Sequence, residues 1–170
     1  MEYLILPIIQ HLAEALPELS VVDEDYGQLE VIDEEGKRMY PLTFPAALVD
    51  LEQVDWSSLQ GGNQIGEARI KARLLVDCYD DTHIGSGTEL FIQTREELRR
   101  RMHLALQGFS PSGNSGSGLM RVESKFYTFD HGIKVYQETY TCRVAELTPR
   151  QTARLSSPVR FGIETSSGRP

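Results

Sequence analysis

The sequence has little of several things that would define a protein class. It has two cysteines, one tryptophan and no apolar run near the roughly 20 residues that span a bilayer. Its apolar start, residues 1–19, carries three glutamates and no Lys or Arg, so we expect no signal peptide. With 170 residues, 40 % hydrophobic and 25 % charged, the composition is that of an ordinary globular domain. The sequence therefore predicts no membrane, secreted or fibrous protein.

Catalytic and cofactor motifs are missing as well. No G-x-S-x-G, H-E-x-x-H, Walker or C-x-x-C pattern occurs, and no helix pattern follows the glycine-rich residues 61–66, which we interpret as a hairpin turn. Cys78 and Cys142 lie in strand-like runs and are expected to be reduced and buried, with a disulfide between neighbouring strands as the alternative. We expect no enzyme, no cofactor and no metal site.

One loop offers an alternative of another class. Asp80, Asp81 and His83 follow a strand-like run and carry side chains that can ligate a divalent metal, as in a metal-dependent enzyme. The sequence offers no second cluster at a fixed spacing. A solvated loop is therefore the favoured interpretation.

Charge is unevenly spread along the chain. The net charge is −8, with 13 acidic and 2 basic residues in 1–60, 11 of each in 61–146, and four Arg and one Glu in 147–170. A protein that binds free nucleic acid usually presents a basic surface, so this balance argues against that function. The acidic front and the basic tail could attract one another between copies of the chain.

Hydrophobic spacing predicts two helices and a set of strands. Apolar residues at intervals of three and four predict a helix over 2–16, and a second helix is predicted over 88–107, capped by Ser86 or Thr88 and with Phe91 on its apolar face. Strands are expected near 19–24, 28–33, 44–54, 67–79, 119–128 and 133–145. Hairpin-length links exclude a doubly wound parallel sheet. The predicted fold class is α+β, a single mostly antiparallel sheet with two helices packed on one face.

Two basic clusters have local interpretations. Arg69, Lys71 and Arg73 alternate with apolar residues of the 67–79 strand, so they share one face and should meet acidic residues of an adjacent strand or of another subunit. The run 99–101 is interpreted as a solvated helix face paired with the preceding glutamates, and binding to phosphate or to an acidic partner is the alternative.

Two segments are predicted to lie outside the core. Residues 110–118 hold four Ser, three Gly, one Pro and one Asn, so we expect a mobile loop. We divide the chain into a domain over 1–146 and a C-terminal extension over 147–170, extended or disordered. Candidate interface residues are Arg69, Lys71, Arg73, Ser110, Pro111, Ser112, Gly113, Asn114, Arg150 and Arg154.

A series of short motifs over residues 1–146 resembles phage and prophage tail-terminator (tail-completion) proteins. The motifs are the opening helix with its leucine-rich face, Phe44-Pro45-Ala46-Ala47-Leu48-Val49, Gln64-Ile65-Gly66, Ala105-Leu106-Gln107-Gly108-Phe109, the strand with Arg121, and Lys134-Val135-Tyr136-Gln137-Glu138-Thr139-Tyr140. Their order and spacing, more than any single motif, carry the resemblance.

The resemblance implies a structural protein of the virion tail or neck, present in the host cytoplasm during assembly. Such proteins form rings, typically hexamers, that cap the tail tube, end its polymerisation and offer a surface for head joining. The implied partners are other copies of the chain, the tail tube protein and a neck or connector protein, with no specific nucleic acid and no membrane. A head-tail connector or stopper is the alternative within the same class.

Overall fold

The computed structural model describes residues 2–31, 40, 42–59, 62–112, 116–130 and 132–147. In chain order the elements are η1 (Glu2–Leu4), α1 (Ile5–Ala15), β1 (Val21–Glu24), β2 (Ala46–Ser58), β3 (Gln64–Asp77), α2 (Phe91–Leu106), β4 (Met120–Phe129) and β5 (Ile133–Glu146). No helix in these ranges is both long and apolar enough to cross a membrane.

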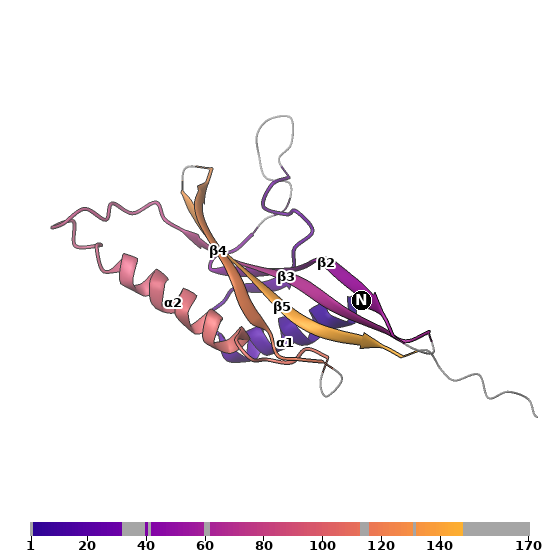
Figure 1. The fold of residues 1–170 in the computed structure, drawn as a ribbon. Coiled ribbons are helices and arrows are strands. Elements are labelled where there is room, and N and C mark those ends of the chain that lie inside the picture. Colours follow the sequence, from indigo (N-terminus) through magenta and orange to yellow (C-terminus); the bar gives the residue numbers. More distant parts are fainter. Residues whose placement is uncertain are drawn as a thin grey trace, which may run out of the picture.

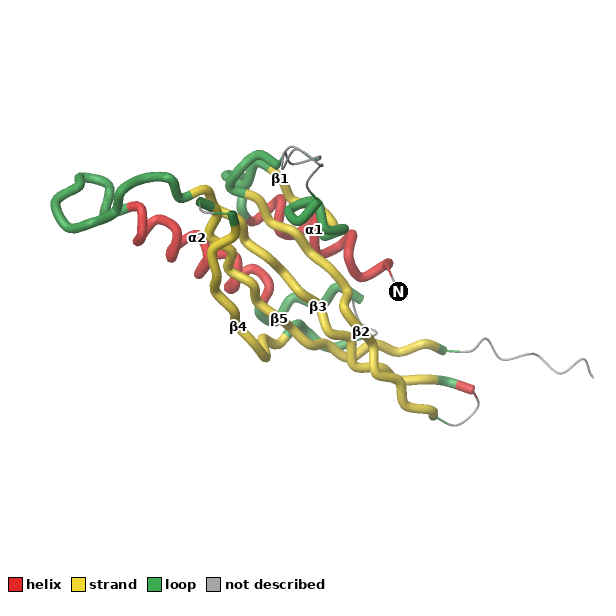
Figure 2. Tube along the Cα trace, turned by 90° about the horizontal axis from the view of Figure 1, so that it is seen from above, coloured by secondary structure: helices red, strands yellow, loops and turns green. Residues whose placement is uncertain are grey.

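Five strands form one sheet in the order β1-β2-β3-β5-β4 (Figure 1). β1 runs parallel to β2, and every other neighbouring pair is antiparallel. Both helices lie on one side of the sheet (Figure 2). The predicted α+β fold class, with a single mostly antiparallel sheet and two helices on one face, is confirmed.

Alternation along β3 builds the main core. Ala68, Ile70, Ala72 and Leu74 point to the helix-covered face and are buried against residues of both helices, among them Ile8 and Met102. The opposite face of the sheet, which we call the open face, holds a smaller apolar cluster beside β1 that includes Leu48 and Leu75. Period-two patterning therefore set which β3 residues enter the core.

The predicted strand over 28–33 is wrong for the part that the structure describes. Residues 28–31 form a turn after β1, and 32–33 lie outside the described residues. Gly27 has a φ of 87°, and the Gln28 amide donates to the Glu24 carbonyl while its oxygen accepts from the Tyr26 N–H. A side chain thus satisfies backbone groups that a strand ladder would otherwise use, and glycine supplies the left-handed backbone.

The predicted cap of α2 is wrong in detail. The residue before the helix is Leu90, which makes no side-chain cap bond. The Ser86 and Thr88 hydroxyls lie 3.1 Å apart, and Thr88 donates to the Asp81 carbonyl, so both serve the preceding loop. Phe91 is also exposed instead of buried, because the buried apolar residues of α2, Met102 and Leu106, lie in its second half.

Candidate functional site

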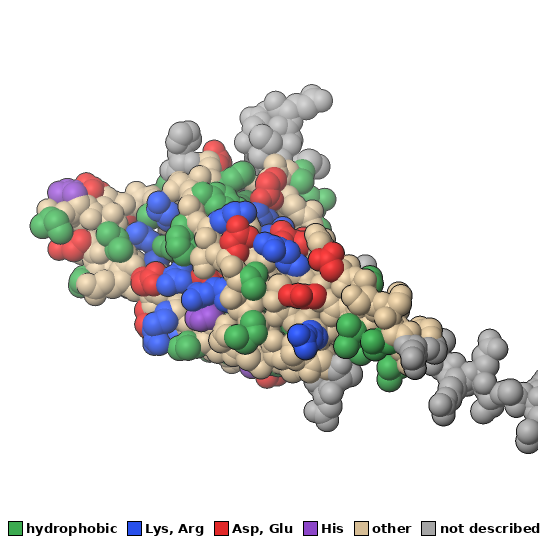
Figure 3. Space-filling view, viewed as in Figure 1, with side chains coloured by type: hydrophobic (Ala, Val, Ile, Leu, Met, Phe, Trp, Pro, Cys, Tyr) green, Lys and Arg blue, Asp and Glu red, His purple; other side chains and the backbone are tan. Residues whose placement is uncertain are grey.

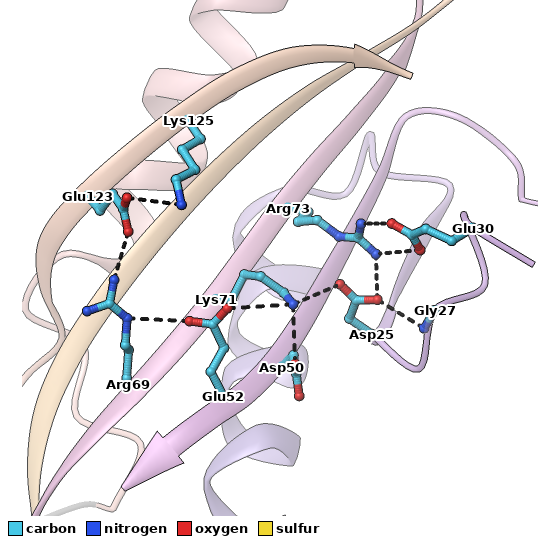
Figure 4. A network of polar contacts seen from close by, with 10 residues as sticks. All are labelled: Asp25, Gly27, Glu30, Asp50, Glu52, Arg69, Lys71, Arg73, Glu123 and Lys125. Atoms are coloured by element: carbon cyan, nitrogen blue, oxygen red, sulfur yellow. Dashed lines mark hydrogen bonds and ion pairs between the residues drawn. The ribbon is translucent and has the colours of Figure 1, made fainter. Parts of the chain in front are cut away.

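A row of charges crosses the middle of the open face. Arg69 lies 3.4 Å from Glu52 on β2 and 2.7 Å from Glu123 on β4. Lys71 is 3.3 Å from Asp50 and 3.8 Å from Glu52. The basic residues of β3 are therefore flanked by carboxylates of the neighbouring segments of the same chain, as Figure 4 shows.

Arg73 continues the row where it meets the turn after β1. Its guanidinium lies 2.5 Å from Asp25 and also donates to Glu30. Burial acts to lower the pKa of Arg73, but hydrogen bonds to Glu30, Tyr127 and Asp25 outweigh it and raise this pKa further above the usual arginine range. Arg73 is therefore a permanent cation that fastens the turn to the sheet.

These contacts confirm that the row of Arg69, Lys71 and Arg73 meets acidic residues of adjacent segments. Figure 3 shows acidic and basic side chains intermixed over the middle of the molecule. Asp25 and Glu30, which pair with Arg73, belong to the same chain and not to another subunit. A role for the row in a subunit interface stays a prediction.

A second polar cluster is buried between α2 and the sheet, and sequence reasoning missed it. Glu138 of β5 is fully buried and lies 2.7 Å from Arg99 of α2 and 2.7 Å from Arg121 of β4. The Ser124 hydroxyl donates to the same carboxylate over 3.3 Å. The signal was present in the sequence, because Glu138 falls on the otherwise apolar period-two face of Tyr136, Tyr140 and Cys142.

The glutamate pairing predicted for the arginine run of α2 is confirmed for two of its three members. Arg99 and Arg100 pair with Glu96 and Glu97 one turn earlier. Arg101 instead reaches Glu18, just after α1, and so joins the two helices.

The segment after α2 is less detached than predicted. Pro111 is buried, and Ser112 is partly buried. Arg143 of β5 exchanges hydrogen bonds with Ser117, from Ser117 N–H to the carbonyl at 3.1 Å and from Arg143 N–H to the hydroxyl at 2.8 Å. The flanks of this loop therefore pack along β5. Gly113, Asn114, Arg150 and Arg154 lie outside the described residues.

The acidic loop after β3 is exposed. Asp81 accepts a 2.7 Å contact from the His83 ring, and both side chains face solvent. No group of three or more His, Cys, Asp or Glu in the described part of the chain is arranged to hold a metal ion. Neither Cys78 nor Cys142 forms a disulfide; Cys142 is buried as predicted, whereas Cys78 is only partly buried.

The molecule is elongated, and each end carries exposed apolar side chains. At one end the β2–β3 hairpin and the end of β5 extend past the helices, as both ribbon views show (Figures 1 and 2). We call residues 54–66 the arm; its exposed apolar residues are Trp56, Leu59 and Ile65.

We call residues 77–92, at the opposite end, the end region. Its exposed apolar residues are Tyr79, Ile84, Leu90, Phe91 and Ile92, and Ile84 is 91 % exposed. Monomeric proteins rarely gather large apolar side chains on protruding segments, so both ends are candidate interaction surfaces.

A pocket of about 570 Å³ lies between the end of α1 and α2, where Glu18 and Arg101 form part of its wall with Pro45 and Leu98. Its volume is in the range of small-molecule sites. In its wall, Glu18 and Arg101 are paired with each other.

No family model and no curated protein matches this chain. A chain of a solved structure, described as the virion of a native gene transfer agent particle, matches with 14 % identity and a TM-score of 0.43. The match covers 82 % of this chain and 92 % of that chain.

Proposed function

We propose that this chain is a structural protein of a phage or prophage virion, located in the tail or neck. It caps the tail tube, ends its polymerisation and provides the surface to which the head joins. It works without a cofactor, by binding copies of itself and neighbouring virion proteins.

The observation that carries the proposal is the exposure of apolar side chains at both ends of an elongated domain. Trp56 on the arm and Ile84 in the end region stand on segments that extend past the helix layer. Two different surfaces at opposite ends suit a heterologous contact, which closes into a ring when the rotation between copies divides a full turn. A stable contact of this kind buries about 1,000 Å² or more.

Within this class, the tail-terminator assignment rests on the resembling motifs. They lie on α1, at the starts of β2 and β3, at the end of α2 and on β4 and β5. The proposed partners are the chain itself, in a ring of six copies, the tail tube protein and a neck or connector protein.

Electron microscopy of particles assembled without this protein tests the proposal. A terminator predicts overlong tails, because nothing stops tube growth. Tails of normal length with detached heads would assign the chain to a connector or stopper instead. Complete, infectious particles would overturn both assignments.

A further inference from the structure

The end region is acidic as well as apolar. Residues 77–92 contain Asp77, Asp80, Asp81 and Glu89 and no Lys or Arg. Among the described residues, none of these four carboxylates forms an ion pair with a lysine or arginine; Asp81 contacts His83, and Glu89 accepts from Ser86. Their charge is thus free to attract a cationic partner.

A pocket of about 220 Å³ opens beside these acids, where the end region meets α2. Asp77, Asp80, Phe91 and Arg95 line it. Arg95 is nine-tenths buried, and its Nε has no hydrogen-bond partner in the described part of the chain. Even with this cation included, acidic residues outnumber basic ones by four to one in this region.

The C-terminal segment has the complementary chemistry. Residues 148–170 contain four arginines and one glutamate. In the sequence, Val159, Phe161 and Ile163 alternate with Arg160, Gly162 and Glu164, a period-two pattern of apolar residues. Such a segment offers apolar side chains and positive charge together, as the exposed acidic end region requires.

The origin of this segment favours binding between copies. It follows Leu147, just beyond the end of β5, at the arm end of the molecule and away from the end region (Figures 1 and 2). Copies arranged head to tail bring the end region of one to the arm end of the next, where that segment begins.

We propose that residues 148–170 of one copy bind the end region, residues 77–92, of another copy. This inference rests on the self-association included in the proposed function and specifies which surfaces make the contact. Arginines of the segment pair with Asp80 and Asp81, and its apolar side chains cover Tyr79 and Ile84.

Mixing two charge-reversed variants of the full chain tests the inference. One variant carries Asp80→Lys and Asp81→Lys, and the other carries Arg154→Glu and Arg160→Glu. Sedimentation velocity at low and moderate salt should show that each variant alone self-associates at least about tenfold more weakly than the unchanged chain. The equimolar mixture should recover association, because the intact segment of one variant meets the intact end region of the other, and the two reversed surfaces are also of opposite charge.

Two further variants separate the contact from general effects of charge and folding. Glu14→Lys with Glu24→Lys changes the net charge by the same amount as Asp80→Lys with Asp81→Lys. Because these exposed acids lie outside the end region, this variant should leave association unchanged. Ile84→Ser removes one exposed apolar side chain and should weaken association without altering thermal unfolding.

The inference is overturned if the unchanged chain stays monomeric or if neither reversed variant loses association. It is also overturned if the mixture associates no more strongly than each variant alone. The last result, combined with loss in each variant alone, would mean that these charges affect association without meeting one another. Overlong tails in particles lacking the protein would uphold the proposed function even then, so the two failures are distinguishable.

Discussion

At the residue scale, Glu138 shows how one carboxylate joins three elements. It accepts hydrogen bonds from Arg99 on α2 and from Arg121 and Ser124 on β4 while it is fully buried on β5. The helix-covered face would otherwise bring two arginines together beside an apolar core. The buried negative charge is therefore the group that allows both cations to lie there.

Glu138→Gln should lower the free energy of unfolding by about 2 kcal/mol, because the two arginines lose their common anion while the shape is kept. Urea denaturation at pH 7 measures the change. Glu97→Gln is the matched control, since Glu97 pairs with Arg100 on the exposed surface of α2, and its cost should stay under about 0.5 kcal/mol. Equal effects of the two variants would contradict a special role for Glu138.

The two cysteines should differ in reactivity. Burial raises the pKa of the Cys142 thiol on the helix-covered face, so little thiolate forms there near pH 8. Cys78 is only partly buried. Alkylation of the native protein followed by mass spectrometry should modify Cys78 first, and both cysteines should react once the chain is unfolded in urea. Faster modification of native Cys142 would refute this.

His103 gives stability a dependence on pH. Burial, aided by Arg121, lowers the pKa of His103 beside the Tyr140 hydroxyl. The unfolded chain therefore binds a proton at His103 more readily than the folded chain does. The contribution of neutral His103 to the free energy of unfolding is present above about pH 6.5, and it is lost as the pH falls through the lower pKa of the folded state. NMR titration of the imidazole should find a pKa below that of a free histidine. His103→Gln should flatten the loss of stability over the same range.

At the scale of elements, the arm depends on a close approach of backbone and side chains. A Cβ added at Gly66 of β3 would lie 2.7 Å from Val54 Cγ1 and 2.9 Å from Trp56 Cε3, both on β2. Trp56 and Gly66 are cross-strand partners, and the indole occupies the space that a side chain at position 66 would need.

Gly66→Ala should therefore destabilise the protein by about 1–3 kcal/mol through overpacking. Thermal unfolding or urea denaturation measures it. In a double-mutant cycle, Trp56→Ala should relieve part of this cost, because it removes one of the two clashing side chains. Additive effects of the two substitutions would show that the contact is not the cause.

The predicted elements were most accurate where patterning was strongest. The period-two run of β3 and the three-four spacing of α1 were placed within a few residues of their observed positions. The predictions failed where a few specific contacts determine the local structure, as in the turn at Gln28 and the start of α2. Hydrophobic periodicity reports which face is buried, and it carries no information on side chains that bond to local backbone groups.

At the scale of the whole molecule, we propose that residues 1–146 form the folded domain and 147–170 an extension. Trypsin applied to dilute protein should cut first at Arg150 or Arg154 and leave a resistant core, because the arginines of β3 and α2 are held in pairs. Time-resolved mass spectrometry identifies the cuts. Early cleavage within β3 would contradict the division. Slower cleavage at higher protein concentration is expected if the extension binds another copy.

The fold class, the helix-covered face of the sheet and the row of basic residues on β3 could be predicted from the sequence, because each depends on periodicity along one segment. The folded structure was needed to show which acids those bases meet, that Glu138 is buried between two arginines, and that the arm and the end region lie at opposite ends. These facts depend on the order of strands and the docking of α2, which join residues far apart in the chain. A pattern within one segment does not predict which residues of distant segments it will contact.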